Sequence, residues 1–313
     1  MKELLVYFFI CIRLKIQKIT KKEVLKNYPQ SDKMVVIERI HDLYIVSKYK
    51  GLQIYVSNNE LNNIKIIKAI VKIFKDKTIE IYEKQKILSN NDIRELSKIS
   101  RNIYLNSKYM ERRNLNALNE VFCCDITTYL MILDKIEFLV GKCNKNCNKT
   151  DEKVIFIITQ LIKYIKYVSY HDYRTCMANA ILLKSGVCVD FAITLYKCME
   201  DLGIECLLVN GISQGEEKDI LSKVNIFNKS NHTWNQIKID DIWYNFDITW
   251  FLSTNNQKWI FATDEEFYEQ YYHISEQKNN ICKDEYNKER KKHLIEKYSK
   301  YENFLDNYDK GIK

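Results

Sequence analysis

The chain contains one proline, Pro29, and seven glycines among its 313 residues. Both residue types interrupt helices and mark turns, so their scarcity predicts long helices and few flexible linkers. Apolar residues make up 46% of the chain, which is enough for a substantial core, and the 29% of charged residues therefore does not indicate disorder. The length allows one large domain or two ordinary ones.

The formal net charge is +8. A basic patch could attract nucleic acid or an acidic membrane surface. The lysines are dispersed among aspartates and glutamates, however, and there is no Arg-rich run with interleaved aromatic residues. We therefore expect no nucleic-acid binding as the main function. A basic nucleic-acid binder is kept as an alternative, and its affinity would fall steeply with salt.

The cysteines do not form the spacing of a secreted disulfide framework. Most lie in apolar, periodic stretches, as buried free thiols do. Cys143 and Cys147 could be a metal pair, but no second pair follows at zinc-site spacing, so we expect a structural role and no metal. The ten are Cys11, Cys123, Cys124, Cys143, Cys147, Cys176, Cys188, Cys198, Cys206 and Cys282.

The N-terminus begins with an apolar run from Leu4 to Ile12. The run has the length of a signal-peptide core but lacks a small-residue cleavage site. It is also too short to span a bilayer, which needs about 20 residues. We expect a buried strand or helix here, no membrane span, and a cytoplasmic protein.

Residues 1–110 read as a small α+β region of unknown role. Two β-like runs, VVIERIHDLYIVS and LQIYVS, flank Lys50-Gly51, where we expect a turn. Residues 62–77 have helical apolar spacing, TIEIYEK (78–84) is β-like, and Ser89 resembles a helix start before IRELSKISRNIYL. No chemical motif is present, and His41 in a β-like run is expected to be structural.

The next part of the chain, residues 111–275, is predicted to be a second domain with its core at about 150–265. Residues 111–141 and 152–169 have helical patterns, and β-like runs ECLLVNGIS, HTWNQIKI and IWYNFDITW follow after residue 204. Residues 276–313 are charged with helical spacing. This tail is expected to be a solvated helix or a partner-binding segment.

A strong amphipathic helix begins at Cys188, and Gly203 follows it as a helix-ending glycine would. Cys188 therefore lies in the first turn, where unpaired backbone N–H groups and the helix dipole favour a thiolate. The thiolate is a nucleophile, and the same N–H groups could donate to an oxyanion. A buried thiol without chemistry is the alternative. The apolar face comprises Cys188, Phe191, Ala192, Leu195, Cys198, Met199 and Leu202.

Two β-like runs around Asp240-Asp241 predict a hairpin. With a two-residue loop, Ile239 pairs with Ile242, and counting outward places Trp234 opposite Asp247. His232 then shares that face and lies diagonal to Asp247, about 7–8 Å away at the backbone. Two side chains can bridge this distance.

A carboxylate beside a histidine suggests a general base held in place. Asp247 would fix the tautomer of His232, which would deprotonate Cys188 and later protonate a leaving amine. A polar pair in an ordinary hairpin is the alternative. It is weakened because Trp234, Trp243 and Trp250 are expected to cluster around the pair and exclude water.

These motifs together resemble the transglutaminase-like superfamily of papain-type folds, including its bacterial members. The resemblance covers residues 150–265 and rests on Gly-Val-Cys188, Phe191-Ala192, Leu202-Gly-Ile204, Val209-Asn-Gly211, His232-Thr-Trp234-Asn235 and Trp243-Tyr244-Asn-Phe-Asp247-Ile-Thr249-Trp250. It implies an α+β fold in which a cysteine-bearing helix packs on an antiparallel sheet. It also implies Cys188, His232 and Asp247 as a catalytic triad.

The reaction implied is acyl transfer or amide hydrolysis through a cysteine thioester, on a protein or peptide substrate and without a cofactor. Members include transferases, proteases and inactive scaffolds, so a binding or scaffold protein is the alternative. Trp234, Trp250, Tyr170 and Asn179 are candidates for substrate contacts, and the N-terminal region or the tail for a protein partner. Asp190 stands where many bacterial relatives have glycine, and Asn179 where many have an aromatic residue. Asp190 would raise the pKa of the cysteine or face solvent.

Overall fold

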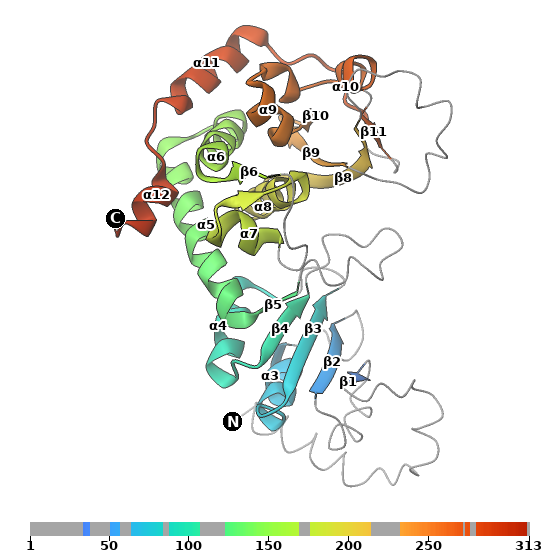
Figure 1. Cartoon of the computed structure of the whole chain (residues 1–313), viewed down its shortest axis with the longest axis vertical. Coiled ribbons are helices and arrows are strands. Elements are labelled where there is room, and N and C mark those ends of the chain that lie inside the picture. The colour runs from blue at the N-terminus through green and yellow to red at the C-terminus, as the bar shows by residue number, and fades with distance from the viewer. Residues whose placement is uncertain are drawn as a thin grey trace. The chain divides into compact units, whose positions relative to one another are not determined.

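The computed structural model divides into two compact units, residues 1–133 and 134–313 (Figure 1). It describes residues 34–37, 51–56, 64–83, 88–106, 123–168, 176–213, 232–271, 273–275 and 280–311. The predictions for Leu4–Ile12, His41 and Tyr170 lie outside these ranges. The predicted domain limits stay a prediction.

The first unit contains a five-stranded sheet with strand order β1-β2-β3-β4-β5. Strands β1 to β4 run parallel and β5 is antiparallel to β4. Helices α3 and α4 contact one another, as expected when successive right-handed crossovers share one face of a sheet. The elements are β1 (Met34–Ile37), β2 (Gly51–Val56), α3 (Ile64–Ile73), β3 (Thr78–Glu83), α4 (Asn90–Ile99), β4 (Ile103–Asn106) and β5 (Cys123–Asp125).

Two predictions for this unit are wrong in detail. Gly51 is not in a turn but begins β2, which runs parallel to β1. The expected helix beyond Ser89 ends at Ile99, and the IYLN segment is β4, where Ile103 and Leu105 are buried and Tyr104 is exposed. That alternation is the period of a strand. The helix start is confirmed, because Ser89 and Asp92 form a capping box.

The second unit is built around two buried helices, α6 (Thr150–Tyr164) and α8 (Cys188–Asp201), which contact each other. Residues 154–158 of α6 are all completely buried, so this helix is covered on every side. It ends at Tyr164, five residues earlier than predicted, and strand β6 follows. The other elements before α8 are α5 (Ile126–Asn146), which begins in the first unit and ends in the second, β6 (Lys166–Tyr167), α7 (Cys176–Leu182) and β7 (Ser185–Gly186).

Helix α8 packs on β8 and β9 of an antiparallel sheet with strand order β10-β9-β8-β11. The predicted fold class is thereby confirmed. Ile239 pairs with Ile242, as predicted, and Asp240 and Asp241 have φ values of +49° and +67°, as a tight hairpin turn requires. The strands are β8 (Cys206–Ile212), β9 (His232–Ile239), β10 (Ile242–Phe246) and β11 (Ile274–Ser275).

The run IWYNFDITW is not a strand throughout. Strand β10 ends at Phe246, and Asp247 is the N-cap of helix α9 (Ile248–Thr254), because its carboxylate accepts hydrogen bonds from two backbone N–H groups of the first turn. A 3₁₀ helix (Gln257–Trp259) and α10 (Asp264–Tyr271) follow.

The charged tail packs onto the second unit. Its helices α11 (Lys288–Ser299) and α12 (Phe304–Asp309) contact α6 and bury Leu294, Tyr298 and Leu305. The Arg290 guanidinium also makes two hydrogen bonds, of 2.9 and 3.2 Å, with the Asp151 carboxylate on α6. The solvated-helix expectation is therefore wrong. No helix in the described part of the chain has the length and apolarity needed to cross a membrane.

Candidate active site

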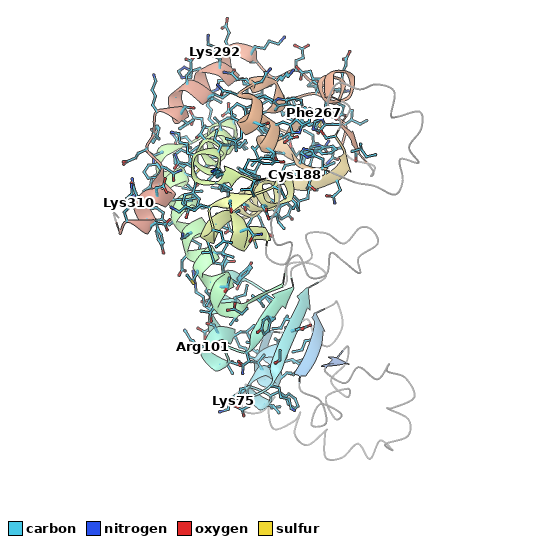
Figure 2. All side chains as sticks on the ribbon, in the orientation of Figure 1. Lys75, Arg101, Cys188, Phe267, Lys292 and Lys310 are labelled. Carbon is cyan, nitrogen blue, oxygen red and sulfur yellow. The ribbon has the colours of Figure 1, made fainter. Side chains whose placement is uncertain are left out.

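Cys188 is the first residue of α8, and its side chain is partly exposed (Figure 2). The predicted first-turn position is thus confirmed, as is the end of the helix at Gly203, which has a φ of +70°. The helix is tied to the sheet by a buried hydrogen bond of 3.0 Å from Asn235 Nδ2 to the carbonyl of Ala192. This bond joins the cysteine helix to strand β9, which carries His232.

Asp190 does not face solvent, so that expectation is wrong. Its side chain is fully buried, and Oδ2 accepts a 2.8 Å hydrogen bond from the N–H of Val187. A Cβ atom at Gly186 would lie 2.6 Å from the Cβ of Asp190, so only glycine allows this approach. Asp190 and Gly186 together fix the backbone immediately before Cys188.

His232 and Asp247 are in direct contact. His232 Nε2 lies 2.5 Å from Asp247 Oδ2, with His232 8% exposed and Asp247 fully buried. Since Nε2 faces the carboxylate, Nδ1 is the ring nitrogen left for a thiol. Burial lowers the pKa of His232, but the charge and hydrogen bond of Asp247, together with an interaction with Cys188, outweigh it and raise this pKa to about 10.

The Asp247 carboxylate receives four hydrogen bonds. Oδ1 accepts from the N–H groups of Thr249 and Trp250, each at 3.1 Å, and Oδ2 accepts from His232 and, at 2.9 Å, from His273 Nε2. Burial raises the pKa of Asp247, but the two histidines overcome this effect and hold it well below its usual range. The carboxylate is therefore ionised in the folded protein.

The contact with His273 has no counterpart among the sequence predictions. No motif surrounds this residue, and the only signal was that the chain contains just five histidines. Ligand atoms of His232, Asp247 and His273 lie within 4.8 Å of one another, and this donor set suits a divalent cation such as zinc. The distances from Asp247 Oδ2 to the Nε2 atoms of His232 and His273, 2.5 and 2.9 Å, are those of hydrogen bonds. The absence of a metal stays a prediction.

A family model described as the transglutaminase-like superfamily matches residues 138–248. The match includes Cys188, His232 and Asp247. Residues 138–248 are a transglutaminase-like domain. His273 lies beyond the matched segment.

The solved structures that are similar to this chain are distant. One is described as a TGase (17% identity, TM-score 0.32), of which this chain covers 34% with 41% of its own length. Another is the "Putative Cysteine Protease from Cytophaga hutchinsonii" (18% identity, TM-score 0.29), of which it covers 53% with 49% of its own length. The chain thus spans about a third of the length of the first protein and about half of the length of the second. No curated protein matches.

Aromatic rings surround His232 and His273, although one of the three tryptophans predicted to lie there, Trp243, does not. Trp234 stacks on His232 with ring centroids 6.1 Å apart, and Trp250 meets it edge-on at 6.3 Å. A tryptophan that was not predicted, Trp259, lies near the other histidine, with its ring centroid 5.5 Å from that of His273. Trp243 instead lines a surface pocket near the turn of the hairpin, because it lies four residues before Asp247, about 13 Å along the strand.

The four predicted substrate-contacting residues differ in exposure. Trp234 and Asn179 are each only 3% exposed, and Trp250 is the one described member with a partly exposed side chain. A residue absent from the prediction, Tyr167, is 46% exposed and lies on β6 opposite Gly186. Burial raises its pKa, and the charges of Cys188 and Asp247 raise it further. Tyr167 and Trp250 are therefore exposed or partly exposed aromatic residues close to the site, the first opposite Gly186 and the second edge-on to His232.

Proposed function

We propose that the transglutaminase-like domain is a cysteine enzyme that acts on amide bonds through a thioester. The observation that carries this proposal is the buried His232–Asp247 pair, whose histidine also interacts with a partly exposed cysteine at a helix N-terminus. A protein that only binds a partner has no need of this combination. Burying a charged pair costs free energy, so the arrangement favours a chemical role.

Each residue has one role in the proposed reaction. His232 Nδ1 holds the proton taken from the thiol, in line with the raised pKa of this imidazole, and Cys188 Sγ attacks the carbonyl carbon of the amide. Backbone N–H groups at the start of α8 are suited to stabilise the oxyanion. As the C–N bond breaks, the departing nitrogen takes the proton back from His232, and Cys188 is left as a thioester. Asp247 stays ionised throughout and stabilises the imidazolium.

The thioester is resolved by a second nucleophile. His232 removes a proton from water, which gives hydrolysis, or from an amine, which gives acyl transfer. The C–S bond then breaks and the carboxylic acid or the new amide leaves. The proton on His232 returns to Cys188 Sγ. Both reactions use the same three residues, so the acceptor must be identified by measurement.

The first test is the rate of iodoacetamide modification of Cys188 at neutral pH, read by peptide mass spectrometry. Cys206 is the comparison cysteine, since this residue is also free and of intermediate exposure, and burial raises the pKa of its thiol. Cys188 is expected to react faster than Cys206, and to lose this advantage in His232→Ala. Equal modification rates of Cys188 and Cys206, unchanged in His232→Ala, would favour a catalytically inactive binding or scaffold protein.

The second test is turnover. A glutamine-containing peptide is incubated with the protein, and ammonia release and incorporation of cadaverine are both measured. Release without incorporation indicates hydrolysis, and incorporation indicates transfer. Cys188→Ala should abolish either product, and activity retained in that variant would contradict the assignment of the nucleophile.

A further inference from the structure

His273 lies in the connection between α10 and β11, where the sheet brings it to the end of strand β9. Ser275 pairs with Gly211 on β8, and Gly211 pairs with His232 on β9. The backbone N–H of His273 donates to the carbonyl of Phe267 at 3.2 Å. These contacts place the imidazole of His273 against Asp247, although 26 residues separate the two in the sequence.

The surroundings of His273 determine its tautomer. Its side chain is completely buried, Nε2 contacts Asp247 Oδ2, and no described residue forms a hydrogen bond with the buried Nδ1 atom. A neutral ring protonated on Nδ1 would leave that buried donor unsatisfied and would set the bare lone pair of Nε2 against the Asp247 carboxylate. The proton therefore belongs on Nε2. Four apolar rings surround the imidazole with centroids 4.6–5.5 Å away, namely Trp234, Trp250, Trp259 and Phe267.

Among the described residues, the titratable groups that contact His273 are Asp247 and His232. Burial lowers the pKa of His273 and the nearby His232 lowers it further, and the attraction of Asp247 does not offset these two effects. His232 and His273 thus differ in charge, since Asp247 stabilises the imidazolium of the first while the second stays neutral. Asp247 Oδ2 therefore accepts one hydrogen bond from the charged ring of His232 and one from the neutral ring of His273.

We propose that His273 is a positioning residue of the active site, whose neutral imidazole donates Nε2–H to Asp247 Oδ2 and holds this carboxylate in place while His232 changes its protonation state. When His232 gives its proton to the leaving amine, it becomes a weaker donor to Asp247. A fully buried carboxylate that loses donor strength tends to rotate or to draw in water. The constant bond from His273 opposes both. The role rests on the proposed function, whereas the bond itself can be tested without it.

The kinetic test compares two substitutions at this position. His273→Phe fills the aromatic surroundings but removes the donor, and His273→Gln keeps an N–H group near the position of Nε2. By analogy with the outer-shell partners of metal ligands, we expect His273→Phe to lower kcat by about 10- to 100-fold, with KM unchanged. His273→Gln should restore most of kcat. His293→Gln, an exposed histidine on α11, is the matched control and should match the wild type.

Equal kcat values for His273→Phe and the wild type would overturn the proposal. So would a rise in KM alone, or equal losses in the Phe and Gln variants. Circular dichroism and thermal unfolding report whether each variant is folded. If His273→Phe does not fold, the Gln variant and the following measurement decide.

A spectroscopic test is independent of turnover. In protein labelled with ¹⁵N-histidine, the Nε2 of His273 should have the chemical shift of a protonated nitrogen and Nδ1 that of a bare nitrogen at pH 7.5. The same result is expected in Cys188→Ala. A protonated Nδ1 at this pH would overturn the proposal. If the wild type shows no turnover but the tautomer is as expected, the proposed function fails while the His273–Asp247 bond stands.

Discussion

The two sheets of this chain bury different kinds of side chain. Among the described residues of the first unit, the buried groups are almost all apolar, with Ile54, Ile79 and Ile81 completely buried on adjacent parallel strands, and Ser100 is the one buried polar residue. The second unit buries polar and charged groups in quantity along its antiparallel hairpin. They include His232, Thr233, Asn235, Gln236, Asn245, Asp247 and, beside β11, His273.

This contrast shows where precise alignment is needed. An apolar core is stabilised by burial and tolerates small shifts, whereas a buried polar group must find its partner or cost free energy. The hydrogen bonds of the Asp247 carboxylate depend on the positions of three elements: α9 through Thr249 and Trp250, β9 through His232, and the α10–β11 connection through His273. We therefore expect changes in the first sheet to affect stability, and changes around Asp247 to affect reaction rate.

The largest expected effect is that of Asp247→Asn on kcat. The amide keeps an oxygen for the N–H groups of α9, but its NH₂ group would face the Nε2 atoms of two histidines and force His232 into the wrong tautomer. By analogy with serine triads, kcat should fall by about a thousand- to ten-thousand-fold. Steady-state kinetics and thermal unfolding would measure it.

The matched control is Asp151→Asn, which changes another buried carboxylate of the same unit, bonded to Arg290 and Tyr286. It should lower stability and leave kcat within a few-fold of the wild type. Similar losses of kcat in both variants would mean that the buried polar groups of this unit act only through stability. The buried polar groups around Asp247 would then have no separate effect on reaction rate.

The next effect tests the opposite side of the comparison. Ile81→Ala removes a completely buried side chain from the middle of the first sheet and should cost about 2–5 kcal/mol of stability. Where the protein remains folded, kcat and the labelling rate of Cys188 should not change. Urea unfolding measures the stability, and the iodoacetamide assay measures the labelling rate of Cys188. A lower labelling rate in folded Ile81→Ala would show that the core of the first sheet affects the reactivity of the thiol.

A smaller effect is expected in the pH dependence of stability. The pKa of His232 rises from its ordinary value of 6.5 to about 10 on folding, so its imidazolium contributes stability that is complete below pH 6.5 and is lost as the pH rises to 10. The depressed pKa of Asp247 contributes stability above its ordinary value of 3.8 that is lost as the pH falls. The pair is thus most stabilising between about pH 4 and 6.5. The difference in unfolding free energy between the wild type and His232→Gln should shrink from pH 6.5 to 10, and a constant difference would contradict this account.

Local patterns predicted much of this fold and only part of the site. The helical period located α8 and its cysteine, and the two-residue turn at Asp240-Asp241 was enough to derive the pairing of Ile239 with Ile242, because both are set by neighbouring residues. The start of α9 was missed because the apolar run around Asp247 continues a strand pattern, although aspartate is also a preferred N-cap. His273 and Trp259 reach the site through long-range packing, for which a single sequence carries no local signal.

The smallest expected effect is that of removing metal ions, and it bears on the same buried cluster. His232, Asp247 and His273 offer a zinc-like donor set, yet the two contacts with Oδ2 are 2.5 and 2.9 Å, whereas ligands held about 2.0–2.2 Å from a tetrahedral zinc ion lie more than 3 Å apart. Dialysis against EDTA should therefore leave kcat and the melting temperature unchanged, and added Zn²⁺ should inhibit by breaking the His232–Asp247 bond. Loss of activity in EDTA that Zn²⁺ restores would show instead that these residues hold a working metal ion, and the polar groups buried in the second unit would then serve metal binding rather than proton transfer.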